Sequence, residues 1–359
     1  MAVSKKLKGL YMGFFDGLET ACANLISNFI EIRYLRKFEG GGNVPVSLKK
    51  SVKEYWSKYK KISPRWAWYY AKCNGIEDPR YIPNTLYYTK IDQHFNQRKL
   101  GWGFNDKNYY SRIFAGIKQP KTVVRNISGI FLDEDYHLIS KEDAIRKILE
   151  EGEVICKPSL ESGSGRSIVF WKADKDKEDI ARFLNDTNEK DYIVQAIIVQ
   201  HPELDKVHKG SVNSIRIMSL LMPDGVFILS SNLRMGVDNS RIDNVTAGGI
   251  SAGIKTDGYL NEFATTYYTG VKLDKHPQGL IFKGYKVPGF EDAIALVKQA
   301  APLIPHFRLV AWDIAIDENG NALLIEANMR KGGINLCQFN NGPLFGDLTE
   351  RVLNEVFQK

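Results

Sequence analysis

Two segments of the sequence combine residue types that could hold a phosphate-bearing ligand and a metal ion. In the first, residues 154–170, an apolar strand ends at Lys157, and a loop containing Gly163, Ser164 and Gly165 leads into a second apolar strand. Backbone N–H groups of such a loop can contact phosphate oxygens, and the lysine adds a fixed cation. A plain hairpin turn is the alternative interpretation of this pattern.

The second segment, residues 311–328, predicts two alternating strands joined by a tight turn at 317–320. The two ends of such a hairpin lie close together, so Asp313, Glu326 and Asn328 should converge, the last two from the same face of their strand. Three oxygen donors in one place suit Mg²⁺. Solvated edge carboxylates are the alternative, but Glu326 lies in an apolar strand, where a buried carboxylate needs a partner.

The elements that must position these residues predict an α+β fold with antiparallel sheet. Short turns such as 223–225 and 317–320 join neighbouring strands, which is typical of hairpins. A glycine-rich dinucleotide fingerprint after a strand and a phosphate-binding P-loop motif are both missing from the sequence. We expect strands at 122–127, 154–157, 168–171, 192–198, 214–222, 226–230, 310–316 and 322–326, and helices near 140–151, 175–186, 290–301 and 344–357.

The order of these motifs resembles the ATP-grasp superfamily, and in particular the D-alanine–D-alanine ligase pattern of a lysine-proline strand, a glycine loop and a Glu-Ala-Asn strand. The resemblance extends upstream to Asp106-Lys107-Asn108 and Pro120-Lys121-Thr122. Residues 193–198 are similar to the linker strand that recognises adenine. Gln195 departs from the acidic residue common there, but main-chain groups carry much of that contact.

Further motifs narrow the resemblance to the sugar-transfer-associated ATP-grasp group and its teichuronopeptide-biosynthesis relatives. These are residues 213–216, 232–236, 243–244 and 248–250, together with the basic aromatic N-terminal region. The likeness covers roughly residues 50–355. It implies an ATP-grasp fold, in which two α/β subdomains with antiparallel sheets clasp ATP, plus a helical aromatic-rich N-terminal region.

The resemblance implies a carboxylate–amine ligase that uses ATP and one or two Mg²⁺ ions and forms an amide through an acyl phosphate. Arg216 and Arg234 would be catalytic, and Asp313, Glu326 and Asn328 would hold the metal. The substrate would meet Asn244, Gly248, Gly249 and Arg330. The nucleotide would be bound by Lys107, Lys157, Gly163, Ser164, Gly165, Gln195, Ala196, Ile198 and Glu203.

Positive charge is concentrated in residues 46–125, which hold 17 Lys or Arg and 5 Asp or Glu, whereas the whole chain has a net charge of +7. Four of the six tryptophans lie there too. This composition predicts a site for an anionic saccharide, with Trp66, Trp68, Trp102 and Tyr109 stacking on sugar rings, and Arg65, Arg80 and Arg98 as candidate cations. A basic surface over an aromatic core is the alternative. No nucleic-acid motif accompanies the charge.

Apolar residues at helical spacing predict an amphipathic helix over residues 8–38, which would dock on its own protein, on a second copy or on a membrane surface. We expect segments at 1–45 (this helix), 46–120 (the basic aromatic region), 121–200 and 201–359 (two ATP-grasp subdomains). The chain lacks an apolar run of about 18 residues, and its four cysteines are far apart, which favours the cytoplasm, with the inner face of the membrane as the alternative location.

Two other functions remain open from the residues. One is phosphoryl transfer to a saccharide on the same fold, and the other is non-catalytic glycan binding. For the ligase, the expected partners are ATP, a carboxylate-bearing saccharide that is free or linked to a nucleotide or lipid, and an amine or amino acid, and no nucleic acid is expected. A homodimer is a further possibility.

Overall fold

The computed structural model describes residues 43–160, 167–186, 190–266, 271–330 and 332–358. The expected helix at 8–38 and the loop with Gly163, Ser164 and Gly165 lie outside the described residues. Contacts divide the described residues into two compact units, one made of those up to Phe95 together with those from Gly342 onward, and the other Asn96–Asn341. The expected segments at 1–45, 46–120, 121–200 and 201–359 stay a prediction.

The smaller unit consists of short helices, and the prolines at 64, 79 and 83 lie between them. Trp56, Trp66, Tyr70 and Tyr81 are fully buried in it, and the Trp66 and Tyr81 rings both stack on Tyr70. Its elements are α3 (Val46–Trp56), α4 (Arg65–Asn74), α5 (Asn84–Leu86), the π-helical turn η1 (Tyr87–Ile91), α6 (Asp92–Phe95), η6 (Gly346–Leu348) and α14 (Thr349–Phe357).

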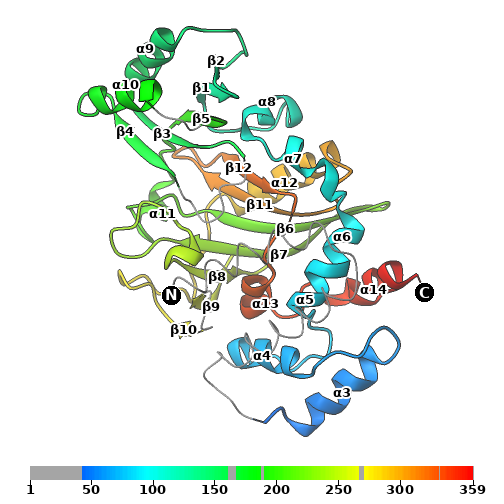
Figure 1. Ribbon diagram of the computed structural model, residues 1–359. Coiled ribbons are helices and arrows are strands. Elements are labelled where there is room, and N and C mark those ends of the chain that lie inside the picture. The colour runs from blue at the N-terminus through cyan, green and yellow to red at the C-terminus, as the bar shows by residue number, and fades with distance from the viewer. Residues whose placement is uncertain (1–42, 161–166, 187–189, 267–270, 331, 359) are drawn as a thin grey trace. The chain divides into compact units, whose positions relative to one another are not determined.

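The larger unit contains a five-stranded antiparallel sheet in the order β2-β1-β5-β3-β4. Helices α9 and α10 cover one of its faces (Figure 1), and Ala144 and Ile148 of α9 join Val154, Cys156 and Trp171 of the sheet in a common core. Its elements are β1 (Thr122–Ile127), β2 (Ile130–Leu132), α9 (Lys141–Glu151), β3 (Glu153–Pro158), β4 (Val169–Lys172), α10 (Lys177–Asp186) and β5 (Tyr192–Ala196).

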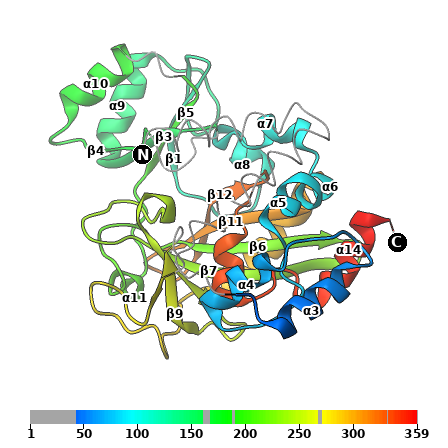
Figure 2. The ribbon, with the colours of Figure 1, turned by 60° about the horizontal axis from the view of Figure 1, so that its bottom comes forward.

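A seven-stranded antiparallel sheet in the order β10-β9-β8-β7-β6-β11-β12 forms the rest of this unit. Both views keep α9 and α10 on the far side of the smaller sheet from β11 and β12 (Figure 2). The strands are β6 (Ile215–Met222), β7 (Gly225–Met235), β8 (Ile250–Ile254), β9 (Leu260–Thr266), β10 (Lys272–Leu273), β11 (Leu309–Ile316) and β12 (Ala322–Asn328).

Short helices connect and cover the strands of the larger unit. They are η2 (Arg98–Leu100), α7 (Gly101–Phe104), η3 (Lys107–Tyr109), α8 (Tyr110–Ile113), α11 (Pro202–Asp205), η4 (Val245–Ala247), α12 (Phe290–Ala300), η5 (Ala301–Leu303) and α13 (Asn335–Asn341). Among the described residues, no helix is long and apolar enough to cross a bilayer.

The seven-stranded sheet has one apolar face and one polar face, because side chains alternate along each strand. Ile215 and Ile217 of β6 and Trp312 and Ile314 of β11 lie in the core that α12 covers. Arg216 and Asp313 lie between them in sequence and therefore on the opposite face. On that face α13 packs over β7, β8 and β9.

The strands expected from the sequence are confirmed, as are the helices near 140–151, 175–186, 290–301 and 344–357. Both sheets are antiparallel, so the expected α+β class is confirmed. Strands β2, β8, β9 and β10 and helix α13 were not expected. Strand β7 also continues to Met235, five residues past the expected end, and thereby places Arg234 on a strand.

Candidate active site

Three charged residues lie directly opposite one another on neighbouring strands of the larger sheet. In the strand register Arg216 of β6 faces Asp313 of β11, and Asp313 faces Glu326 of β12. Because antiparallel neighbours in register are the closest side-chain pairs across strands, this register alone brings the three charges together. The sheet thus places a cation and two carboxylates in one row.

Asp313 is the centre of this row and is 5% exposed. Its carboxylate accepts two hydrogen bonds from Arg216, Nε to Oδ1 and Nη2 to Oδ2, both at 2.6 Å, and one from Arg234 Nη1 at 3.1 Å. Burial opposes ionisation of Asp313, but the two guanidinium groups outweigh it and lower its pKa to about 2. Asp313 is therefore a carboxylate at all physiological pH values.

Glu326 pairs with a different cation. Lys107 Nζ lies 2.7 Å from Glu326 Oε1, and this lysine is itself buried. Burial opposes ionisation of Glu326, but Lys107 holds its pKa below the ordinary value. Asn328, on the same strand, donates from Nδ2 to Asp313 Oδ2 at 3.3 Å. The three expected metal-binding residues therefore lie together, as the hairpin pattern predicts.

A β-bulge explains how β12 turns Glu326 toward Asp313 while its apolar residues stay in the core. The register passes from Asp313↔Glu326 directly to Ile314↔Leu324, so Ile325 is an extra residue. A bulge shifts the alternation of side chains by one. Leu324 and Ala327 consequently both reach the apolar core, although they are three residues apart.

Lys157 projects from β3 on the face of the smaller sheet opposite the helices, since Val154 and Cys156 occupy the helical side. Burial and the nearby Lys107 charge lower the pKa of Lys157 to about 8, and Glu326 and Asp313 oppose that decrease. Lys157 therefore lies within electrostatic reach of the charged row of the other sheet. The two carboxylates do not fully offset the cost of burying its positive charge, so an anionic ligand would stabilise the charged form of Lys157.

Arg234 reaches the row from β7 and also connects it to the loop that follows. Its Nη2 lies 3.6 Å from Asp243 Oδ1, and Asp243 accepts hydrogen bonds from the backbone and side chain of Ser214. Arg234 Nε is buried and has no hydrogen-bond partner among the described residues. Asp243, which sequence reasoning left without a role, thus positions Arg234, and its adjacency to Asn244 was the available signal.

The expected substrate loop is held by its own hydrogen bonds. Asn244 caps η4 by accepting from Thr246 N at 2.8 Å, and its carbonyl accepts from Gly249 N. Gly248 has φ of +117°, and a Cβ at Gly249 would lie 2.8 Å from Met235 O, so both positions require glycine. These contacts explain why Asn244, Gly248 and Gly249 form a turn. Their role in binding a substrate stays a prediction.

The remaining expected nucleotide and substrate residues are spread around the row. Gln195 lies in β5 between β1 and β3 and donates from Nε2 to Pro120 O at 3.4 Å, while Ala196 N donates to Lys121 O. Ile198 lies two residues past the strand end and is half-buried. Glu203 pairs with Lys206 at 2.6 Å. These roles also stay predictions.

Arg330 lies two residues past the end of β12 and is 7% exposed. A Cβ at residue 101 would lie 2.3 Å from Arg330 Cδ, so Gly101 is needed for the arginine stem to pack there. This close approach fixes the arginine near the end of β12.

The donor set fits a magnesium ion. Mg²⁺ prefers carboxylate and carbonyl oxygens and retains waters or phosphate oxygens in its other positions. Asp313, Glu326 and Asn328 offer oxygens from two adjacent strands. Among the described residues, no cluster of three or more His, Cys, Asp and Glu side chains offers a competing all-protein site.

The expectation of aromatic rings stacking on sugars is wrong for Trp66, which is 1% exposed and forms the core of the smaller unit. Arg80 is also not a free cation there, because it pairs with Asp78 at 2.8 Å and with Asp347 at 3.0 Å. Arg65 is exposed. Much of the aromatic content of residues 46–95 thus serves to build a core in a short helical unit.

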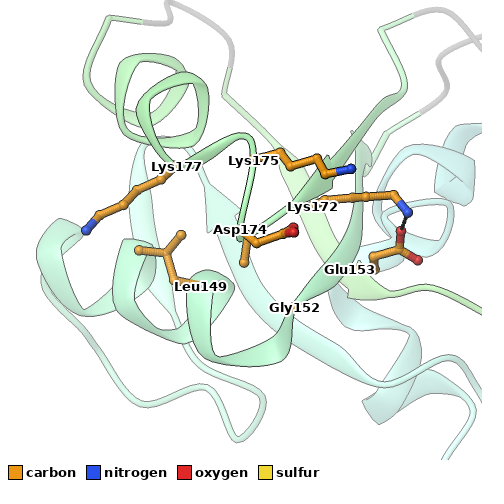
Figure 3. A pocket seen from close by; sticks show the side chains of 8 residues that line it. Leu149, Gly152, Glu153, Lys172, Asp174, Lys175 and Lys177 are labelled. Atoms are coloured by element: carbon orange, nitrogen blue, oxygen red, sulfur yellow. Dashed lines mark ion pairs between the residues drawn. The ribbon is translucent and has the colours of Figure 1, made fainter.

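A depression of about 710 Å³ lies elsewhere, between α9, β3, β4 and the start of α10 (Figure 3). Its lysines do not converge: Lys172 pairs with Glu153, while Lys175 and Lys177 point apart. No side chain of the charged row lines it, and we assign it no function.

The charged row makes a clear stability prediction. Asp313→Asn leaves Arg216 and Arg234 buried without their shared counter-charge, so it should lower the free energy of unfolding by about 3–5 kcal/mol. Glu318→Gln, on the exposed turn of the same hairpin, should change it by less than about 0.5 kcal/mol. Urea unfolding of the metal-free protein measures both.

The same measurement against pH gives an independent check. The pKa of Asp313 is lower in the folded state, so its contribution should be complete above its ordinary value of 3.8 and be lost as the pH falls toward 2. The difference between wild type and Asp313→Asn should shrink in that range. Equal stability of the two proteins at pH 7 would contradict the assigned role of Asp313.

Three solved structures illustrate what this chain is similar to. The ATP-grasp ligase PsnB, complexed with its minimal precursor, Mg and ADP, is 14% identical over 73% of this chain and 62% of its own, with a TM-score of 0.42. D-cycloserine synthetase DcsG is 14% identical over 71% and 69%, with a TM-score of 0.39. The Hydrogenobacter thermophilus 2-oxoglutarate carboxylase biotin carboxylase domain is 16% identical over 71% and 46%, with a TM-score of 0.42.

These likenesses are loose, and the chain spans about three fifths of the length of PsnB. No curated protein matches the sequence. The family model described as "Sugar-transfer associated ATP-grasp" matches residues 87–354, which is most of the chain and includes every residue of the charged row. The chain belongs to the sugar-transfer-associated ATP-grasp family.

Proposed function

We propose that this protein is an ATP- and Mg²⁺-dependent carboxylate–amine ligase. The observation that carries the proposal is the charge balance of the site: four cations, Arg216, Arg234, Lys107 and Lys157, lie around three carboxylates, Asp313, Glu326 and Asp243. An excess of cations next to paired oxygen donors is what a metal-bound polyphosphate needs. Family membership supports the same ligand.

In this proposal each part of the site has one task. Lys157, Lys107 and Arg216 bind ATP phosphates together with the loop that contains Gly163, Ser164 and Gly165. Gln195, Ala196 and Ile198 border the adenine, and Glu203 completes the nucleotide site. Asp313, Glu326 and Asn328 would hold one or two Mg²⁺ ions, which would neutralise negative charge of the nucleotide.

The reaction then proceeds in two steps, formation of an acyl phosphate and its aminolysis. A carboxylate oxygen of the acceptor attacks the γ-phosphorus, ADP leaves, and an acyl phosphate forms. The amine nitrogen attacks the acyl carbon, inorganic phosphate leaves, and the nitrogen loses a proton. Phosphoryl transfer depends on positioning and charge stabilisation, which fixed cations provide.

Arg234 is the residue we assign to the acyl group. Its Nη1 is held by Asp313 and its Nη2 lies near Asp243, whereas its buried Nε has no partner among the described residues. A preorganised donor for a developing oxyanion contributes about 10²–10³ in rate. Asn244, Gly248, Gly249 and Arg330 would border the acceptor.

The family description supports an acceptor of the saccharide class. A uronic acid of a surface polysaccharide supplies the carboxylate that the chemistry needs, and an amino acid or another amine supplies the nitrogen. Because ATP is the phosphate donor, we place the reaction in the cytoplasm.

The products test the proposal. The purified protein is incubated with Mg-ATP, amino acids and uronic-acid-bearing acceptors, and the products are identified by mass. An amide together with ADP and inorganic phosphate is the expected result. A stable phosphoester without free phosphate would identify a phosphotransferase instead, and protein that never turns over ATP would support glycan binding.

Glu326→Gln should keep the fold and lose turnover by about 100-fold or more, because metal coordination contributes several kcal/mol to catalysis. Wild-type protein should gain thermal stability from Mg-ATP, by about 2.7 kcal/mol at a concentration 100 times Kd. In Glu326→Gln that gain should no longer depend on Mg²⁺. Glu318→Gln is the matched control on the same hairpin, and near-normal activity of Glu326→Gln would refute the metal assignment.

The pKa of Lys157 predicts how ATP affinity depends on pH. This pKa is about 8 in the nucleotide-free protein, and bound phosphates must raise it, so binding takes up a proton above pH 8. Affinity should therefore be highest below pH 8 and fall as the pH rises, approaching about tenfold per pH unit. Calorimetric titration between pH 7 and 9.5 measures this.

Lys157→Met should bind ATP more weakly and lose the slope. Lys172→Met provides the control, since Lys172 lies on the neighbouring strand and pairs with Glu153 at the surface. If wild type and Lys157→Met show the same slope, Lys157 does not contact the phosphates.

A further inference from the structure

Strand β12 carries two of the candidate metal ligands although it is an edge strand. Within the part of the chain that the structure describes, it pairs with β11 alone and is the last strand in the sheet order. The outward backbone groups of an edge strand lack a partner strand, and strand ends are where pairing is lost first. Glu326 and Asn328 lie at this end, so something besides the sheet must hold their backbone.

The Tyr110 hydroxyl takes the place of the missing strand at Ala327. It donates to Ala327 O at 3.3 Å and accepts from Ala327 N at 3.2 Å. Ala327 N belongs to the peptide group shared with Glu326, and Ala327 O belongs to the peptide group shared with Asn328. One hydroxyl therefore restrains both peptide planes that carry the ligands.

Packing fixes the ring that presents this hydroxyl. Tyr110 opens α8 and is 4% exposed. Its ring contacts Phe114 edge-on at 5.2 Å between centroids, and Phe114 in turn contacts Trp312 of β11 at 5.8 Å. Burial and, secondarily, the Glu326 charge raise the pKa of Tyr110, so the hydroxyl stays protonated and can donate.

The segment that carries Tyr110 is anchored to the smaller sheet. Lys107 N donates to Ser159 O at 2.9 Å, and Asn108 Nδ2 donates to Asn126 O at 3.1 Å. Further along the same edge, Leu324 N donates to Lys118 O at 2.9 Å. The chain between residues 107 and 118 thus runs along the outer edge of β12, and Tyr110 is its contact at the metal-binding end.

We propose that Tyr110 is a positioning residue for the metal site, whose hydroxyl holds Glu326 and Asn328 in the orientation that binds the ion. This rests on the proposed function, because it takes those two residues as metal ligands. We assign Tyr110 neither as a metal ligand nor as a catalytic group, because its hydroxyl contacts the backbone of Ala327. Groups that orient metal ligands typically change metal affinity by about 10–100-fold when they are removed.

Tyr110→Phe tests the proposal, because it removes only the hydroxyl and keeps the ring in its packing. Mn²⁺ replaces Mg²⁺ as the probe, and its binding to the complex of the full chain with a non-hydrolysable ATP analogue is measured by electron paramagnetic resonance. The Mn²⁺ affinity should fall by about tenfold or more. In turnover, half-saturation by Mg²⁺ should rise similarly, while kcat at saturating Mg²⁺ changes by less than about threefold.

Tyr81→Phe is the matched control. Tyr81 is fully buried in the smaller unit, and its hydroxyl bonds with Asn74 and Ile76 O, so the substitution also removes a buried hydroxyl. It should leave Mn²⁺ affinity unchanged. Equal Mn²⁺ affinity in wild type and Tyr110→Phe would overturn the proposal.

Amide hydrogen exchange of the nucleotide-free protein gives a second readout that needs no activity. A peptide covering residues 326–329 should exchange faster in Tyr110→Phe, and one covering β6 should not change. Unchanged exchange at 326–329 would also overturn the proposal. If wild type itself binds no Mn²⁺ with the nucleotide analogue, the proposed function fails, and that result differs from a loss confined to Tyr110→Phe.

Discussion

The bidentate pair between Arg216 and Asp313 is the interaction on which the rest of the site depends. Asp313 lies in the second-to-last strand of the larger sheet and is almost completely buried, so its charge persists only because guanidinium groups face it. The pair spans β6 and β11 and thereby fixes their register. Arg234 extends the same network to Asp243 and the loop beyond β7. The ion pair that fixes the strand register therefore also fixes the relative positions of the charged side chains of the site.

The site holds more positive than negative charge, and this excess has a cost in the ligand-free state. The lowered pKa of Lys157 is the direct sign of that cost, because burial and Lys107 both disfavour its proton. Under the function that we propose, the phosphates of ATP would offset this uncompensated charge. Part of the binding energy would then compensate for the cost of a preorganised site.

The sequence predicts this site well wherever the signal is local. Alternating apolar residues identified β11 and β12, and the tight turn between them correctly brought Asp313 to Glu326. The bulge at Ile325 had no such local signal. On a regular strand Leu324 and Glu326 would face the same side, and the bulge turns them to opposite sides. The end of β7 was missed for a related reason. Residues 230–232 are Ser-Ser-Asn, and their polar face is covered by Asn340 and Asn341 of α13 through hydrogen bonds, which hydrophobic periodicity does not register.

Strand β12 also illustrates why sequence spacing says little about which residues meet at this site. Lys107 and Tyr110 precede Glu326 by more than 200 residues, yet both contact its strand. The helical turn between them is too short to be stable alone and is fixed by both sheets. One segment bonds β1 of the smaller sheet at Asn126 and β12 of the larger sheet at Ala327, so it supports both sheets where they present their charged residues. The residues that we propose for nucleotide binding and for metal binding therefore share residues 107–110 as a common structural support.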